Sequence, residues 1–398
     1  MIRFLVKRTL RALIALYLFI TFVFFFTQLV IPGDFTTQFA MGMNRAAREA
    51  LQKELGLDLP IWQQYLNWLH RLLAGSLGTS FYGYSVTASM KAVLPPTLLI
   101  FLTGTVIAFF IGQWLGKWTA WRGPGPVSGA STFSAIALYT SFPPWLAFLM
   151  VYFFVRRFEL FPSALFLYQN PLAQFRQRLS ESSDLLPNTL ITYMLLTMVA
   201  ALLVLVIGDR VLQRLWRRRL PLPVSVILLP ALAVGSWFAF GFGAPALQIM
   251  HLAGLPILTF VLLSLGETML IMQTTMKDTL GEEYIRVARA KGLPEHMVRD
   301  KHAARNAVIP VFSRLVVSLP YLLTGIVIIE RAVNWPGMGE AMLLALYNKD
   351  TPVVMGALLI IGAISSLARL VLDVVQLYID PRMRDRAIRM GDLGPVKF

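Results

Sequence analysis

Eight apolar stretches of about 20 residues recur along the chain, and they constrain its fold more than any other feature. A helix of about 20 apolar residues is long enough to cross the hydrocarbon core of a bilayer. The stretches lie near residues 12–31, 97–116, 132–155, 186–207, 221–242, 256–275, 308–330 and 354–377. Because backbone polar groups inside a bilayer must be paired within the protein, we predict an all-α polytopic membrane protein with about eight transmembrane helices.

The composition agrees with a membrane protein. Hydrophobic residues make up 57% of the chain and charged residues 14%, whereas a soluble domain has about 25% charged residues. The first apolar stretch follows a basic start, as a signal peptide does. Its length and the lack of a small-residue cleavage site after it predict a retained first helix instead.

The basic residues are unevenly distributed between the segments that join the apolar stretches. With the N-terminus in the cytoplasm, the segments on the cytoplasmic side hold Lys and Arg at about three times the density of those outside. The net charge of +15 therefore sets the orientation of the helices and argues against nucleic-acid binding. We predict a multi-pass protein embedded in the lipid bilayer, with both termini cytoplasmic.

The largest segment predicted outside, residues 32–95, contains an amphipathic pattern. In IWQQYLNWLHRLL, residues 61–73, the apolar side chains recur at helical spacing, and Pro60 suits the first turn. This pattern predicts either a helix in the outer membrane interface or a lid that packs on the bundle. The predicted organisation is a cytoplasmic stub with the first helix (1–31), an extracytoplasmic segment (32–95), a core of transmembrane helices (96–378) and a cytoplasmic tail (379–398).

Motifs for catalysis are absent from the sequence. It contains no GxxxxGK[ST] phosphate loop, no HExxH pair and no GxSxG elbow, and its four histidines are scattered. We therefore expect no enzyme activity, cofactor or metal site in this chain. An integral-membrane enzyme would need converging polar residues in or near the apolar stretches, and a secondary transporter would need an ion-coupling relay there. Few residues are available for either alternative.

Four ionisable residues interrupt the apolar stretches: Glu267, Arg314, Arg369 and Asp373. A charge at this depth is costly and should face the protein interior or a wet cavity. Glu267 is predicted either to line a translocation path or to make an interior hydrogen bond. Arg369 and Asp373 are four residues apart on one helical face, so we predict that they pair.

A charged segment, residues 276–306, separates two apolar stretches. Glu282 and Glu283 suit a helix start, where negative charge interacts favourably with the helix dipole. Arg289 and Lys291 suit a helix end, where positive charge does so. Gly292 is placed to end this helix.

The sequence after Gly292 predicts a second helix, which begins near Pro294 and completes a helix, turn, helix arrangement. Ala288 and Ala290 are small enough to allow the close approach of a partner backbone, and Leu293 offers an apolar contact. Composition alone favours a solvated amphipathic loop over a docking surface.

The residues of this segment resemble the cytoplasmic coupling loop of ATP-binding-cassette importer permeases. The matching residues are Glu283, Tyr284, Ala288, Arg289, Ala290, Lys291, Gly292, Leu293, Val298, His302, Arg305, Asn306, Ala307 and Pro310. Four further stretches match in order: residues 55–80, LPILTF (255–260), Glu330 with WPGMGE (335–340), and DVVQLYIDPRMR (373–384). The pattern is most similar to the first permease of the dipeptide, oligopeptide and nickel group.

The resemblance implies the type I importer fold, a location in a prokaryotic plasma (inner) membrane, and a set of partners. These are a second homologous permease, two cytoplasmic ATPases that use ATP and Mg, and an extracytoplasmic solute-binding protein. Carried over by position, Glu283, Ala288, Ala290, Gly292 and Leu293 would form or shape the part of the loop seated in the ATPase cleft. His302, Arg305 and Asn306 would anchor that loop to the next span, and Glu330 joins Glu267 as a candidate for the translocation path.

The sequence departs from the family pattern in two places. Members usually have six spans, so the pair at about 186–242 is predicted to be inserted, either as peripheral packing or as a platform for another partner. The stretch LIMQTTM (270–276) lacks the Arg residues often found before the coupling loop. Peptides are the expected solute. Relatives that move oligosaccharides or a nickel chelate leave those alternatives open.

Overall fold

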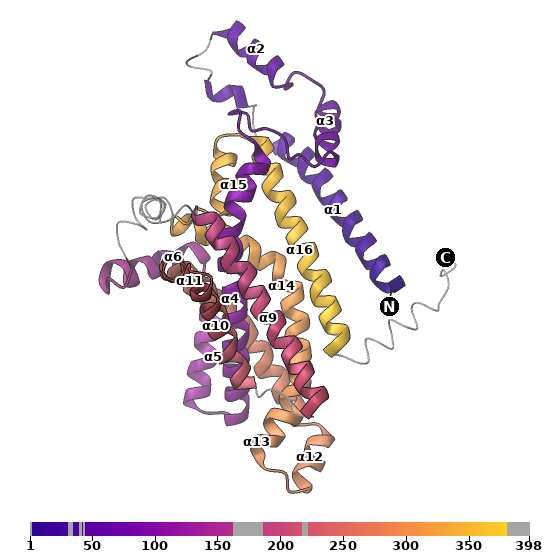
Figure 1. Ribbon diagram of the computed structural model, residues 1–398, viewed down its shortest axis with the longest axis vertical. Helices are drawn as coiled ribbons and strands as arrows, with labels where there is room; N and C mark the ends of the chain where they lie inside the picture. Colours follow the sequence, from indigo (N-terminus) through magenta and orange to yellow (C-terminus); the bar gives the residue numbers. More distant parts are fainter. Residues whose placement is uncertain are drawn as a thin grey trace.

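The computed structural model describes residues 2–30, 35–39, 42, 44–161, 186–216 and 222–379. These residues form a bundle of long helices, as predicted, with α2 and α3 at one end and α12 and α13 at the opposite end (Figure 1). The only extended pairing among them is an isolated bridge between Thr79 and Ser85. We call the two ends of the bundle the α15 end and the α12 end.

The helices are bounded as follows. The first part of the chain forms α1 (Ile2–Val30), η1 (Phe35–Phe39), α2 (Arg45–Glu54), α3 (Ile61–Leu73), α4 (Val86–Arg122), α5 (Pro126–Tyr139), α6 (Pro143–Met150) and η2 (Val151–Arg157). The second part forms α9 (Pro187–Trp216), α10 (Leu222–Ala239), α11 (Gly243–Leu280), α12 (Glu283–Ala290), α13 (Glu295–Met297), η3 (Val298–Ala303), α14 (Ala304–Ala332), α15 (Met338–Tyr347) and α16 (Thr351–Ile379).

Among the described residues, each of the eight predicted apolar stretches is mostly helical. Among the described residues, five helices are long and apolar enough to cross a membrane, and the pair formed by α5 and α6 with η2 would make a sixth. That pair corrects the prediction of one straight helix over 132–155, because it bends by 109° between Tyr139 and Pro143. Pro143 and Pro144 occupy the first turn of α6. Proline restricts the residue before it to extended backbone, so the helix of α5 cannot continue through Phe142.

The centre of the bundle is the contact between α4 and α11, which have 37 and 38 residues. Small residues of α4 spaced by four or eight positions, Gly104, Gly112 and Gly116, face α11. A Cβ at Gly112 would lie 2.8 Å from Thr268 Cβ, and one at Gly116 would lie 2.5 Å from the Met269 carbonyl oxygen. The lack of side chains at these positions lets the two backbones approach closely.

The amphipathic helix predicted for residues 61–73 is confirmed as α3. Pro60 is its N-cap residue rather than part of the first turn. Tyr65 and Trp68 are buried against α1, where the Phe24 and Tyr65 ring centroids are 5.3 Å apart. The Tyr65 and Thr21 hydroxyl groups form a 2.7 Å hydrogen bond. This helix therefore packs on the first helix while Trp62 and Leu66 stay exposed.

The helix pair predicted to be inserted, α9 and α10, is not confined to the periphery. Leu190, Ile191 and Met194 of α9 are fully buried in the same apolar cluster as Phe260 of α11. Trp237 of α10 donates a 2.9 Å hydrogen bond to the Thr197 hydroxyl of α9. The start of α9 is thus part of the central core.

Some predictions concern parts of the chain outside the described residues. Residues 380–398 of the predicted tail lie outside them, together with the last five residues of the motif at 373–384. Arg369 is exposed, but the side chain of Asp373 is outside the described set, so the proposed pair stays a prediction.

Candidate functional site

The first half of the charged segment forms the helix that its predicted start and end residues indicate. Glu282 is the N-cap of α12, and Lys291 is its C-cap. Gly292 has a φ of 73°, a left-handed conformation that strains residues with a Cβ. The Leu293 amide reaches back to the Ala288 carbonyl at 3.4 Å, which closes the end of the helix.

The second half of the segment is shorter and less regular than a separate helix. Pro294 is the N-cap of α13, which has only three residues, Glu295–Met297. A wider helical turn, η3, then leads directly into α14. The segment is therefore one helix, a turn, and an extension of the next long helix.

One side of α12 is buried in the bundle and the other is exposed. Ile285 and Ala288 are 0% and 5% exposed, and they share an apolar cluster with Met276 of α11, Ala120 of α4 and Val298 of η3. Ala288 thus contacts the bundle, so its small size allows packing against this chain. Ala290 is exposed, as the docking interpretation of that residue requires. The exposed surface consists of Glu282, Glu283, Tyr284, Arg286, Val287, Arg289, Ala290, Lys291 and Gly292.

Polar and aromatic contacts fix the segment to the last turns of α4. The guanidinium groups of Arg289 and Arg299 lie 5.7 and 5.9 Å from the Trp121 ring centroid, within the range of cation–π attraction. Asp300 accepts bonds of 2.8 Å from Lys117 and from Arg299. The Arg299 hydrogen bond, reinforced by Lys117, lowers the pKa of Asp300 to about 2, so this carboxylate is ionised at physiological pH. We call these five residues the α4 anchor.

Sequence reasoning missed the α4 anchor. A signal for it exists, because Lys117 and Trp121 are four residues apart and share one face at the end of α4. Of the residues predicted to anchor the segment, Asn306 donates a 2.8 Å hydrogen bond from its amide to the Tyr284 hydroxyl. His302 is partly buried and Arg305 is exposed.

Glu330 lies far from the charged segment and is fully buried at the α15 end of α14. Its carboxylate accepts 2.6 Å hydrogen bonds from the Thr97 hydroxyl of α4 and from the Gly339 amide. The Thr97 hydroxyl in turn accepts a 2.7 Å bond from the Met338 amide. Trp335 donates from its indole nitrogen to the Pro96 carbonyl at 3.3 Å. Glu330 therefore ties the loop before α15 to α4 and does not line an open path in this structure.

Glu267, the other candidate for the path, forms an ion pair inside the bundle. Its Oε1 lies 2.7 Å from Nε of Arg314, which joins α11 to α14. The Glu267 side chain is 12% exposed and that of Arg314 is 51% exposed. The predicted interior hydrogen bond is thus present, and the side chain of its donor, Arg314, extends to the surface.

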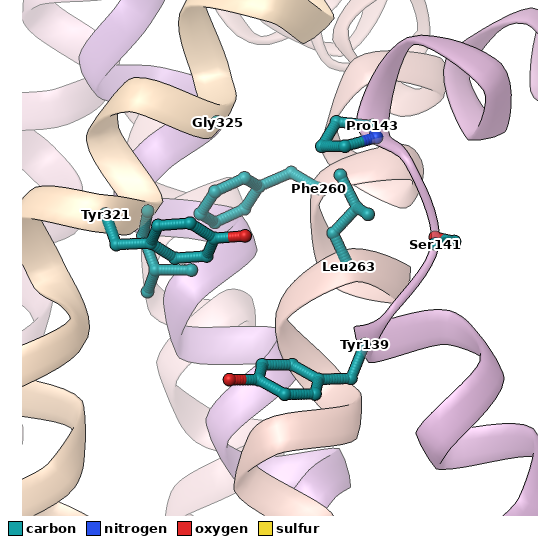
Figure 2. A pocket seen from close by; sticks show the side chains of 8 residues that line it. Tyr139, Ser141, Pro143, Phe260, Leu263, Tyr321 and Gly325 are labelled. Atoms are coloured by element: carbon teal, nitrogen blue, oxygen red, sulfur yellow. The ribbon is translucent and has the colours of Figure 1, made fainter.

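A small pocket follows the ion pair along α14. It is lined by Tyr139, Ser141, Pro143, Phe260, Leu263, Tyr321, Leu322 and Gly325. Figure 2 shows the hydroxyl groups of Tyr139 and Tyr321 directed into the space between α14 and the bend that joins α5 to α6. The broken helix therefore opens a recess beside α14 that holds both apolar and hydroxyl groups.

Comparisons with known proteins cover both parts of the molecule. Residues 220–385 match the family model described as binding-protein-dependent transport system inner membrane component, and residues 1–88 match the N-terminal model of the same kind. A putative peptide permease protein of Brucella suis biovar 1 is 30% identical over 96% of this chain and 99% of its own length. The chain belongs to the inner membrane components of binding-protein-dependent transport systems.

Further relatives place the permease in the dipeptide and oligopeptide group. The oligopeptide transport system permease protein AppB of Bacillus subtilis is 25% identical over 96% of this chain and 99% of its own length. The probable D,D-dipeptide transport system permease protein DdpB of Escherichia coli K12 is 29% identical over 89% of each chain. The first family match contains α12 and the second contains α3, so the permease is matched at both ends of its bundle.

Proposed function

We propose that this permease is one of two homologous membrane subunits of an ATP-driven peptide importer. An extracytoplasmic binding protein delivers the peptide at the α15 end, and two ATPase subunits dock at the α12 end in the cytoplasm. Hydrolysis of ATP with Mg takes place in those partners, because this chain has no phosphate loop. Both termini lie in the cytoplasm in this orientation, which agrees with the distribution of basic residues.

The two-sided packing of α12 is the observation that carries this proposal. A solvated loop has no reason to hold one face fully buried against α4, α11 and α14 while it presents the other as a compact exposed surface. That surface contains an apolar residue, Val287, among charged ones, Arg286 and Lys291. Mixed surfaces of this kind are typical of protein interfaces, in which an apolar centre is surrounded by a polar rim.

The α4 anchor supports a route for movement from α12 into the membrane. When the ATPases close on ATP, the two coupling segments would be drawn together, and each would carry the end of α4 with it. Since α4 packs on α11 through Gly112 and Gly116 without intervening side chains, the two long helices would move as one body. Such a movement would open the bundle alternately to the two sides of the membrane.

A substitution on the exposed face of α12 tests the docking surface. In an importer reconstituted in proteoliposomes, Val287→Glu is expected to reduce ATP-driven peptide uptake by at least about tenfold, since docking would bury an unpaired carboxylate. Val127→Glu on α5 is the matched control, because Val127 is 44% exposed and Val287 is 52% exposed, both at the α12 end. Normal uptake and normal peptide-stimulated ATP hydrolysis in the Val287 variant would contradict the proposed docking surface.

The solute is tested separately from the docking surface. Peptides, oligosaccharides and a nickel chelate are offered to the same reconstituted importer with its own binding protein, and the binding protein is titrated with each by calorimetry. The proposal predicts uptake and binding of peptides. If the importer takes up only oligosaccharides or only the nickel chelate, that solute replaces peptides in the proposal. The proposed role of α12 would not change.

A further inference from the structure

An uncovered stripe of side chains runs along α14. The exposed positions Pro310, Arg314, Val317, Tyr321 and Thr324 recur every three or four residues, which places them on one face of the helix. Val317 and Tyr321 are 61% and 63% exposed. The stripe passes beside the pocket under the α5–α6 bend, where the Tyr321 hydroxyl points inward (Figure 2).

Arg314 lies in the apolar stretch 308–330 that the sequence predicts to span the membrane. It is ten residues from the start of α14, and Glu267 is thirteen residues from the end of α11. At 1.5 Å per residue, the ion pair lies about 15 to 20 Å from those helix ends. A half-exposed guanidinium at this depth does not face lipid tails, because a charge there is costly unless it meets protein or water. The stripe must therefore face a partner bundle or a water-filled path.

The ion pair leaves part of the guanidinium available. Glu267 takes the Nε position of Arg314, and the side chain of Tyr139 is close enough to interact with the same group. The terminal nitrogens of a guanidinium form a planar fork that matches a carboxylate. The Glu267 carboxylate holds the guanidinium in one orientation and balances its positive charge. This ion pair reduces the free-energy cost of placing Arg314 inside a membrane.

We propose that Arg314 binds the carboxylate of the solute during translocation, with Glu267 as its positioning residue and the Tyr139 side chain close to it. The pocket that Tyr321 lines lies farther along α14. The proposal rests on the peptide-import function proposed above and names the chemical group that the path recognises. The aromatic and apolar walls of the pocket accept different side chains, so the site recognises the end group that peptides share.

Uptake of paired peptides tests this site. Proteoliposomes with the complete importer are given one peptide with a free C-terminal carboxylate and the same peptide with a C-terminal amide, each at a concentration that saturates the binding protein. The double variant Glu267→Gln/Arg314→Gln removes both charges and leaves neither residue as a lone ion. It is expected to slow uptake of the free-carboxylate peptide by about tenfold, the scale of one charge-assisted hydrogen bond, and to abolish the preference over the amide.

Arg331→Gln provides the matched control. Arg331 lies on the same helix, its side chain is 62% exposed, and it pairs with Glu340 at 3.1 Å at the α15 end. This variant should keep the preference for the free carboxylate. The swapped variant Glu267→Arg/Arg314→Glu keeps an ion pair but turns a carboxylate toward the path, and it should favour the amide. An unchanged preference in the double variant would overturn the proposal.

Thiol labelling gives a readout that does not depend on peptide uptake. The chain contains no cysteine, so Val317→Cys would introduce its only thiol. A membrane-impermeant thiol reagent should label this position in the complete importer, and the free-carboxylate peptide should slow labelling more than the amide does. Leu203→Cys on α9, where Leu203 is 55% exposed, should stay unlabelled as a lipid-facing control. If the importer moves no peptide, the proposed function fails; if Val317→Cys is not labelled, the water-lined path fails.

Discussion

Glu330 illustrates how one side chain joins elements that are distant in the sequence. The carboxylate receives hydrogen bonds from Thr97, which precedes it by 233 residues, and from the Gly339 amide. There is no room for a side chain at Gly337 or Gly339, where a Cβ would collide with the Glu330 carboxylate. The WPGMGE stretch therefore packs closely around a buried acceptor. Glycine is required at both positions because a larger residue would collide with that acceptor.

Replacing Glu330 should loosen the loop before α15. Glu330→Ala removes the acceptor of two buried donors and is expected to destabilise the permease by about 1–3 kcal/mol for each donor left without a partner. Glu330→Gln should have a smaller effect of the same sign, because one oxygen becomes a donor that faces another donor. Thermal unfolding of the purified permease in detergent measures the change.

Glu340→Gln is the control for this prediction. Glu340 is near the same loop, but its side chain is 20% exposed and pairs with the exposed Arg331, so its loss should cost less than about 1 kcal/mol. Equal effects of the Glu330 and Glu340 variants would contradict a special structural role for the buried carboxylate.

At the scale of elements, the contact between α4 and α11 depends on glycine spacing. Gly116→Leu would push a side chain against the Met269 carbonyl oxygen and Met272 Cβ, which lie 2.5 and 2.7 Å from an added Cβ. Because a carbonyl of a packed helix cannot move aside alone, we expect destabilisation of at least about 1–3 kcal/mol and poor recovery of folded permease. Gly208→Leu on α9, where nothing lies within 4 Å of an added Cβ, should be recovered normally. Size-exclusion chromatography in detergent compares the two variants.

The helices themselves were largely predictable, because each is encoded locally. A run of apolar residues is a sufficient signal for a membrane helix, and Gly292 ends α12 by its own backbone conformation. The bend after Tyr139 was missed because apolar composition continues across it, although Pro143 and Pro144 mark it in the sequence. The start of α11 was placed too late, since residues 243–255 are helical although they were predicted to connect two spans.

The contacts within the candidate site were less predictable than its position. The bond between Lys117 and Asp300 joins residues 183 positions apart, and no local pattern identifies such a pair. The pairing of Glu267 with Arg314 was likewise hidden, although both residues had been recognised as unusual charges in apolar stretches. Sequence patterns located the charged residues, and only packing of the helices determined which of them meet.

At the scale of the whole molecule, α4 connects the two functional ends. Its 37 residues span about 55 Å. Thr97, in the half of α4 nearer its start, bonds to Glu330, and Trp121 is the residue before the last of the helix. A movement of α12 can reach the loop before α15 through this one helix. The strength of the α4 anchor should therefore decide how many peptides are transported per ATP hydrolysed.

Trp121→Leu tests this connection. The variant removes the ring that Arg289 and Arg299 both contact, each contact being worth about 0.5–1 kcal/mol at an exposed site. Since Asp300, Lys117 and the buried face of α12 remain, the importer should assemble and hydrolyse ATP. We expect the number of peptides imported per ATP hydrolysed to fall severalfold, measured in proteoliposomes with both quantities recorded in one sample.

Two further variants separate the anchor from general effects of losing an indole. Trp121→Phe keeps an aromatic face and should retain most of the transport per ATP. Trp114→Leu changes the same residue type on the same helix, at a position that is 60% exposed, and should leave the ratio unchanged. A Trp121→Leu importer with an unaltered ratio would contradict the role proposed here for the contacts of Arg289 and Arg299 with the Trp121 ring.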